Sequence, residues 1–102
     1  MPAQSFGVII KKLREDQGLV LRQVAAALEI DQAIISKFEK GERKPNREQV
    51  LAFAKFFNAK LDDLLIAWLS DKVAYELEDE NVAIKALQMA EEKIKYQKRK
   101  KK

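Results

Sequence analysis

Apolar side chains recur in the N-terminal part of the chain at intervals of three or four residues, the spacing of one helix face. The first such set is Phe6, Ile10 and Leu13. Ser5 precedes it as a candidate N-cap, and Gly18 follows where a left-handed residue commonly ends a helix. A first helix is therefore predicted over residues 5–17. We find no alternation of apolar and polar positions bounded by turn residues, which is the pattern of a strand.

Three more helices are predicted before residue 60, each with its own start and stop residues. Their inward-facing residues are Val24, Ala25 and Leu28 (helix 21–28), then Ile35 and Phe38, then Val50, Leu51, Ala54 and Phe57. Asp31 is expected to cap the third helix and Gly41 to end it. Pro45 and Asn46 should start the fourth helix, with Asn46 as its cap, and Asn58 should end it.

The remainder of the chain predicts two longer helices. The fifth begins near Leu61 and carries a wide apolar stripe, which is Leu61, Leu64, Leu65, Trp68 and Leu69, extended by Val73 and Leu77. The acidic run at 78–80 is a candidate break. The sixth helix has Ala83, Leu87, Ala90 and Ile94 at spacings of 4, 3 and 4, a narrow seam that suits pairing with another helix. From Lys98 onward the tail is basic, and we expect it to fray.

Composition argues against an enzyme. The chain of 102 residues contains neither Cys nor His. Disulfides, thiolate nucleophiles, the commonest general base and the commonest metal ligands are therefore missing. We expect no cofactor, no metal and no small-molecule ligand. No stretch resembles a secretion signal or a membrane span, so a cytoplasmic protein without a membrane partner is expected.

The net charge of +4 conceals an uneven distribution. Residues 1–60 carry 11 basic and 7 acidic side chains, residues 61–90 carry 2 and 7, and residues 91–102 carry 7 and 2. A basic head, an acidic middle and a basic tail suggest that one part of the molecule faces an anion while another does not.

Residues 21–40 carry the most informative pattern, two short helices around a turn of about three residues. Ala25 allows the second helix to approach closely, and Ile30 plugs the turn. With Ile35 and Phe38 facing inward, the outward positions of the second helix are Gln32, Ala33, Ser36 and Lys37. An α-helix fits the major groove of B-DNA, and short polar side chains near its N-terminus can reach base edges.

At these residues the chain resembles the Cro/C1-type (XRE family, phage-repressor-like) helix-turn-helix regulators. The resemblance runs from about Phe6 to Leu65. It is carried by KKLRED at 11–16, the Ala25–Leu28–Ile30 arrangement, IISKFEKGERKP at 34–45 and LDDLL at 61–65. It implies an all-α fold, a lambda-repressor-like DNA-binding domain of about five helices plus a C-terminal helical extension. The expected domains are 1–66 for DNA binding, 67–97 for dimerisation and 98–102 as a basic flexible tail.

The resemblance also implies roles for individual residues. Residues 32–40 would form the recognition helix, in which Gln32, Ala33, Ser36 and Lys37 face bases. Residues facing phosphates would be Arg22, Lys40, Arg43, Lys44 and Asn46. The chain departs from the family where Val20 and Leu21 replace the usual Thr cap and Gln, and where Glu29 replaces a turn Gly. A positive φ at Glu29 would cost roughly 1 kcal/mol.

Ordinary structural explanations compete with these roles. Gln32 and Lys37 could be solvated surface residues, Ala33 could merely avoid a clash, and Ser36 could bond to its own helix. Glu15 or Asp16 could hold Arg22 in an ion pair, and basic loops such as that of Arg43 and Lys44 are common. Trp68 suits a core or a dimer interface better than a ligand site. The acidic cluster at 76–80 suits a solvated face, and the basic tail suits either DNA affinity or solubility.

The pattern as a whole predicts a regulator that binds double-stranded DNA at a palindromic operator as a homodimer. The expected dimer interface is Leu65, Trp68, Leu69, Val73, Leu87, Ala90 and Ile94. Similarity to short phage repressors and controller proteins implies binding at its own promoter. The alternative is a protein-interaction adaptor or an antitoxin built on the same fold, for which the apolar segment from 61 to 94 is the relevant feature.

Overall fold

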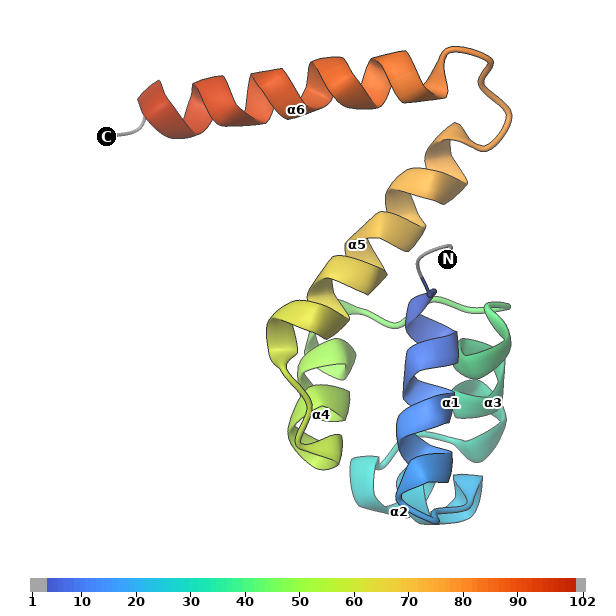
Figure 1. The fold of residues 1–102 in the computed structure, drawn as a ribbon. Coiled ribbons are helices and arrows are strands. Elements are labelled where there is room, and N and C mark those ends of the chain that lie inside the picture. The colour runs from blue at the N-terminus through green and yellow to red at the C-terminus, as the bar shows by residue number, and fades with distance from the viewer. Residues whose placement is uncertain (1–3, 101–102) are drawn as a thin grey trace. The chain divides into compact units, whose positions relative to one another are not determined.

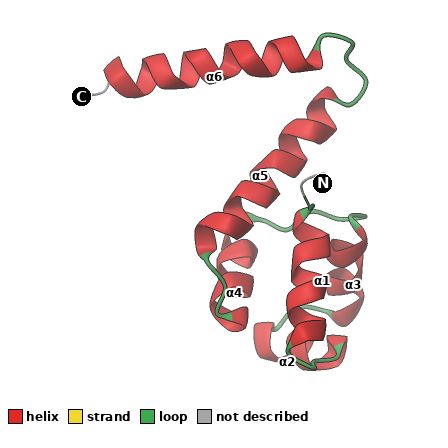
Figure 2. Ribbon diagram, in the orientation of Figure 1, coloured by secondary structure: helices red, strands yellow, loops and turns green. Residues whose placement is uncertain are grey.

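The computed structural model describes residues 4–100 and contains only helices and loops in that range (Figure 2). The helices are α1 (Phe6–Asp16), α2 (Leu21–Leu28), α3 (Gln32–Lys40), α4 (Arg47–Phe57), α5 (Leu61–Leu77) and α6 (Ala83–Lys100) (Figure 1). The all-α prediction is therefore confirmed.

Local side chains cap the starts of α1, α3 and α4, as the sequence predicted. The Ser5 hydroxyl accepts a hydrogen bond from the Val8 N–H, and the Asp31 carboxylate accepts one from the Ala33 N–H at 2.8 Å. At the start of α4, Asn46 and Gln49 accept hydrogen bonds from each other's backbone N–H groups. Each cap satisfies a donor that the first helical turn leaves without a partner.

The chain divides into two compact units, Met1–Lys72 and Val73–Lys102. The first unit extends past the predicted boundary at residue 66, because Ala67 and Trp68 are buried in it. In addition, the Asp71 carboxylate accepts a hydrogen bond of 2.9 Å from the Phe6 N–H at the start of α1. The first three turns of α5 therefore pack with α1 to α4 and complete the first unit.

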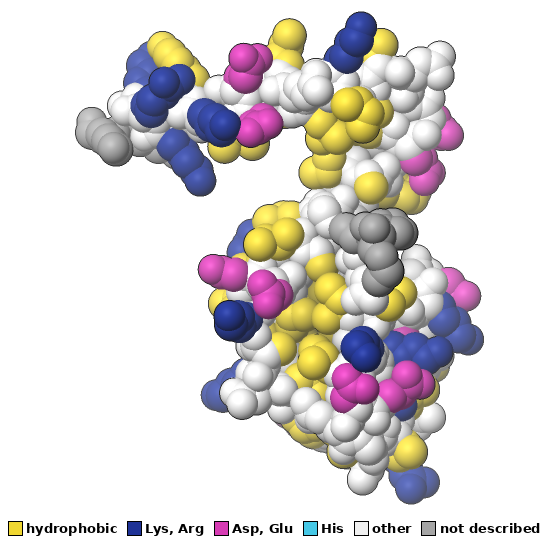
Figure 3. All heavy atoms as spheres, viewed as in Figure 1, with side chains coloured by type: hydrophobic (Ala, Val, Ile, Leu, Met, Phe, Trp, Pro, Cys, Tyr) yellow, Lys and Arg dark blue, Asp and Glu magenta, His cyan; other side chains and the backbone are white. Residues whose placement is uncertain are grey.

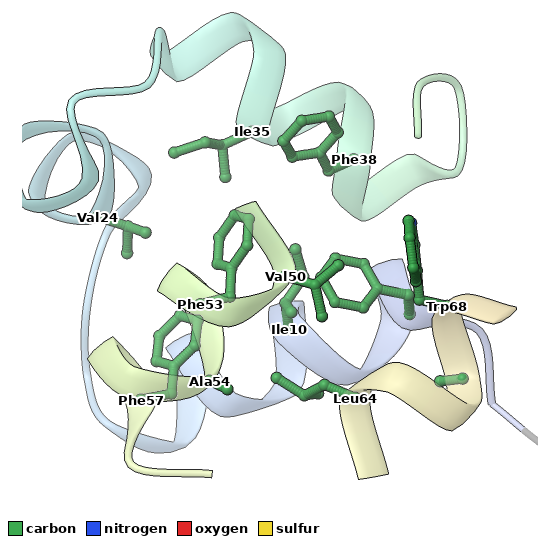
Figure 4. Packing of buried hydrophobic residues seen from close by; sticks show 12 residues of the cluster. Ile10, Val24, Ile35, Phe38, Val50, Phe53, Ala54, Phe57, Leu64 and Trp68 are labelled. Atoms are coloured by element: carbon green, nitrogen blue, oxygen red, sulfur yellow. The ribbon is translucent and has the colours of Figure 1, made fainter. Parts of the chain in front are cut away.

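Phe53 of α4 lies at the centre of the core of the first unit (Figure 4). Its ring meets Phe6 and Phe38 edge to face, with centroids 5.8 and 6.1 Å apart, and stacks on Phe57 at 6.2 Å. Such aromatic pairs add roughly 0.5–1.5 kcal/mol each beyond the apolar area that they bury. This aromatic cluster joins α1, α3 and α4 into one rigid support.

Trp68 belongs to this core, with only 5% of its surface exposed. Its indole N–H donates a hydrogen bond of 2.8 Å to the Pro45 carbonyl, and the Lys72 ammonium lies 3.7 Å from the ring centroid. Its ring is therefore surrounded within one chain, which supports the core position, one of the two that we predicted for Trp68, over the dimer interface. Leu65 also packs partly buried against this core, which weakens its assignment to the interface.

The second unit consists of the end of α5, a short connection and α6. The helix α6 continues to Lys100, past Lys98, where we expected fraying to begin. Lys101 and Lys102, the end of the predicted tail, lie outside that range. Within residues 4–100, no helix is long and apolar enough to cross a membrane.

Candidate nucleic-acid interface

The helices α2 and α3 form the predicted helix-turn-helix. Glu29 ends α2 in the left-handed conformation (φ 55°), and Asp31 caps α3, so the turn occupies three residues. The Ile30 N–H donates to the Ala25 carbonyl at 3.2 Å and closes the turn. Val24 and Ile35 are fully buried between the two helices. The packing fixes α3 at one orientation and leaves its opposite face in solvent.

Three of the four predicted base-contacting residues are exposed on α3, namely Gln32, Ala33 and Lys37. Ser36 is half-buried in a hollow that it shares with Lys11, Leu21 and Lys40. Gln32 and Ala33 are the first two residues of the helix. Their side chains therefore lie at the N-terminal end of α3, before the buried Ile35. In helix-turn-helix proteins, this end of the second helix contacts base edges.

A second hollow brings the start of α2 next to the start of α3. Its lining includes Val20, Leu21, Arg22 and Gln32. Neither Glu15 nor Asp16 holds Arg22 in an ion pair among the described residues, and Asp16 instead lies 3.6 Å from the Lys12 ammonium. Arg22 is exposed and lines this hollow together with Gln32.

The other predicted phosphate-contacting residues follow α3 in the chain. Lys40, Arg43 and Lys44 are exposed at the end of α3 and in the loop that leads to α4. Asn46 is exposed as well, but its side-chain oxygen is occupied as the cap of α4. Only the Asn46 amide NH₂ group is therefore left to donate to a phosphate oxygen.

A largely buried ion pair between Arg14 and Glu39 was not predicted from the sequence. The guanidinium donates to both carboxylate oxygens, at 2.8 and 3.0 Å, and also to the Leu19 carbonyl at 2.9 Å. The hydrogen bond with Glu39 raises the pKa of Arg14 above its ordinary value, against the opposing effect of burial. The pair neutralises the only acidic residue of α3 and ties that helix to α1.

Gly7 is a second structural residue that the sequence did not reveal. A Cβ atom at this position would collide with the carbonyl oxygens of Phe38 and Glu39. The absence of a side chain thus allows α1 to pass directly against the end of α3. Together with Arg14, Gly7 therefore sets how closely α3 packs against α1.

The entry into α2 lacks a side-chain cap, as the departure from the family pattern predicted. Val20 accepts no hydrogen bond through its side chain. The Gln23 side chain partly compensates, because its oxygen accepts a hydrogen bond of 2.8 Å from the Val20 N–H. The start of α2 is therefore held from within the helix.

Comparison with known families identifies the class. Residues 10–64 match the model of a helix-turn-helix family, which spans more than half of the chain. The protein therefore belongs to the Cro/C1-type helix-turn-helix family of DNA-binding transcriptional regulators.

A curated relative shares the same region. The HTH-type transcriptional activator BcrR of Enterococcus faecalis is 35% identical over 60 residues. The match covers 59% of this chain and 29% of BcrR, so the chain spans less than a third of that relative's length.

Solved structures share the fold at lower identity. A clp gene regulator, ClgR from Corynebacterium glutamicum, has a TM-score of 0.57 at 23% identity, covering 70% of this chain and 95% of its own. A hypothetical protein from E. coli has a TM-score of 0.66 at 19% identity, covering 85% and 89%. These likenesses confirm the fold.

Proposed function

We propose that the protein is a sequence-specific transcriptional regulator that binds a palindromic operator in double-stranded DNA as a homodimer, with α3 in the major groove. The observation that carries the proposal is the division of α3 into two faces. Ile35 and Phe38 are buried in the core, whereas Gln32, Ala33 and Lys37 are exposed on the opposite side. This leaves a polar helix face on a rigid support, which is what direct base readout requires.

Side chains at the start of α3 support a reading of bases. Gln can form two hydrogen bonds with adenine, and the Ala methyl group can contact the thymine methyl group. Gln32 and Ala33 have those chemistries at adjacent exposed positions. Lys37 lies about one turn further along and can reach a base or a phosphate, and the half-buried Ser36 completes the set.

The surrounding cations support binding to the DNA backbone. Arg22 lies at the start of α2, and Lys40, Arg43 and Lys44 lie at the end of α3 and beyond it. Because the Arg14–Glu39 ion pair removes the negative charge of α3, no acidic side chain of that helix opposes a phosphate. Each phosphate that these residues neutralise releases counterions and makes the affinity dependent on salt.

The small size of one recognition helix supports a homodimer. One recognition helix contacts too few base pairs for useful selectivity, and two copies related by a two-fold axis double the contacted sequence. A symmetric protein then requires a symmetric site. The resemblance to short phage repressors and controller proteins makes the promoter of the protein's own gene the first site to examine.

The test is fluorescence-anisotropy titration of the full chain with the DNA upstream of its own gene and with a scrambled duplex, at several salt concentrations. We expect tighter binding to the upstream DNA and a steep loss of affinity with salt. Equal affinity for both duplexes, followed by failure to enrich any sequence from random DNA, would contradict the proposal. That result would favour the adaptor or antitoxin function.

A further inference from the structure

The helix α6 presents an apolar seam that nothing in its own unit covers. Not one of its 18 residues is buried. The seam consists of Ala83, Leu87, Ala90 and Ile94, of which Leu87 is 39% and Ile94 53% exposed. Apolar, basic and acidic side chains are all visible along this helix (Figure 3). Their spacing of 4, 3 and 4 keeps all four residues of the seam on one side.

Within its own unit, a helix in this state gains little stability from tertiary packing. Isolated helices of about 12–15 residues are marginal in water, and α-helices in proteins owe most of their stability to an apolar face packed against a partner. With 18 residues, α6 is only slightly longer than that limit. The helix therefore requires a second surface with a matching narrow seam.

The charges at the two ends of α6 identify that surface. Glu78, Asp79 and Glu80 precede the helix, and Lys98, Arg99 and Lys100 form its last turn. The seam thus lies between an acidic end and a basic end. A complementary surface therefore has a matching apolar seam, with basic groups beside the acidic end of α6 and acidic groups beside its basic end.

We infer that α6 pairs antiparallel with α6 of a second copy of the chain. In the register that aligns the seams, Ala83 lies level with Ile94 of the second copy, and Leu87 lies level with its Ala90. The same register brings the turn that contains the acidic residues 78–80, just before α6, next to the basic last turn of α6 in the second copy. The inference rests on the homodimer of the proposed function and specifies the element, the orientation and the register.

A parallel pair with aligned seams has the opposite electrostatic result. It would place the three acidic residues beside their own copies and the three basic residues beside theirs. Like charges held close together destabilise an interface, whereas opposite charges at its rim favour one orientation. The antiparallel pair also has the two-fold symmetry that a dimer on a palindromic site requires.

Cross-linking tests the orientation directly, because the chain has no native Cys. Ala83→Cys and Ile94→Cys chains are mixed in a glutathione redox buffer, and covalent dimers are counted on a non-reducing gel. We expect a cross-link in the mixture and little in either variant alone. Residues 83 and 94 are about 16 Å apart along one helix, too far for a disulfide in a parallel pair.

The matched control is a mixture of Lys85→Cys and Glu92→Cys, which lie level in the same register but on the side of α6 opposite the seam. We expect no cross-link from this pair. Efficient cross-linking of Ala83→Cys alone and Ile94→Cys alone would overturn the antiparallel orientation. Equal cross-linking of all pairs, control included, would show chance collisions and would also overturn the inference.

Sedimentation equilibrium of the full chain tests the element. We expect Leu87→Glu to raise the dimer dissociation constant by about 100-fold or more, because it places a charge in the seam. Ile66→Glu, which changes a residue of α5 that is 65% exposed, should leave the constant within about threefold. A Leu87→Glu chain that remains dimeric, or a monomeric wild type, would overturn the inference. Far-ultraviolet circular dichroism and the melting of the first unit verify that both variants are folded.

DNA titration separates a failure of this inference from a failure of the proposed function. A wild type that dimerises through α6 but binds all duplexes equally leaves the inference standing and removes the proposed function. A wild type that binds DNA selectively but dimerises through a surface other than α6 supports the proposed function and removes the inference about α6.

Discussion

Gln32 is the residue on which the selectivity of the proposed interface depends most. We expect Gln32→Ala to lower the affinity for the preferred site by about 1–3 kcal/mol and to relax the preference at one base pair of each half-site. Gln32 is the first residue of α3 and is exposed, so the substitution leaves the core intact. Selection of sites from random DNA measures the preference. An unchanged selected sequence would show that Gln32 does not contact a base.

Arg43 tests the phosphate part of the same interface. Arg43→Ala should weaken binding to preferred and scrambled duplexes alike, and should reduce the salt slope by about 1 for each chain. The matched control is Lys55→Ala, which removes one exposed positive charge from the last turn of α4, a helix that is not part of the helix-turn-helix. Lys55→Ala should have a much smaller effect on the slope. A changed base preference in Arg43→Ala would contradict its role.

Glu29 carries backbone strain that can be released without loss of a contact. Its φ of 55° is the positive value that the comparison with the family pattern predicted for this turn. Glu29→Gly should raise the free energy of unfolding by roughly 0.5–1 kcal/mol, less than the full strain because Gly also gains freedom in the unfolded chain. Ala26→Gly, in the exposed middle of α2, should lower it by roughly the same amount. Urea titration measures both, and a destabilised Glu29→Gly chain would contradict the explanation.

Single residues were predictable where the cause is local. Ser5, Asp31 and Asn46 cap their helices because a short polar side chain reaches the N–H groups two or three positions along, and the sequence displays that spacing. Trp68 was not predictable in the same way. An apolar stripe indicates that a face is covered, but it does not identify what covers it.

Between elements, the Arg14–Glu39 ion pair sets the position of α3, and its loss should be costly. We expect Arg14→Met to lower the free energy of unfolding by about 3 kcal/mol, because the Glu39 carboxylate, 7% exposed, would lose the guanidinium that pairs with it. The double variant Arg14→Met/Glu39→Met should recover part of this loss, since it removes the buried charge as well. Thermal and urea unfolding of the four chains of the cycle give the coupling energy.

An exposed ion pair within α1 provides the control for the Arg14–Glu39 pair. Lys12 and Asp16 lie 3.6 Å apart with most of both side chains in solvent. Lys12→Met should therefore change the free energy of unfolding by about 1 kcal/mol or less. If Arg14→Met were equally mild, the pair would not be what holds α3 against α1.

The helices themselves were predictable, and their long-range contacts were not. Periodicity and stop residues gave the bounds of α2 correctly and those of α1 within one residue at each end. Arg14 and Glu39 are 25 positions apart, and no local pattern relates them. The same reason explains why the first unit extends to Lys72: the contact of Asp71 with Phe6 joins residues that are 65 positions apart in the sequence.

At the scale of the whole molecule, the proposed homodimer makes a prediction about the spacing of its half-sites. Two copies of α3 that enter successive major grooves on one side of the duplex lie about 34 Å apart, which corresponds to half-sites centred about 10 bp apart. Footprinting or site selection should therefore reveal an inverted repeat with that spacing.

The spacing can be tested by changing only the DNA. Five additional base pairs between the half-sites turn the second site by about half a helical turn and place it on the opposite side of the duplex. Because Phe53 and the Arg14–Glu39 pair hold each α3 rigidly on its own core, α3 cannot rotate by itself to follow the site. Binding should then fall to the affinity for one half-site. If the site with five additional base pairs bound as tightly as the original, the two copies of α3 would not be held in one symmetric dimer.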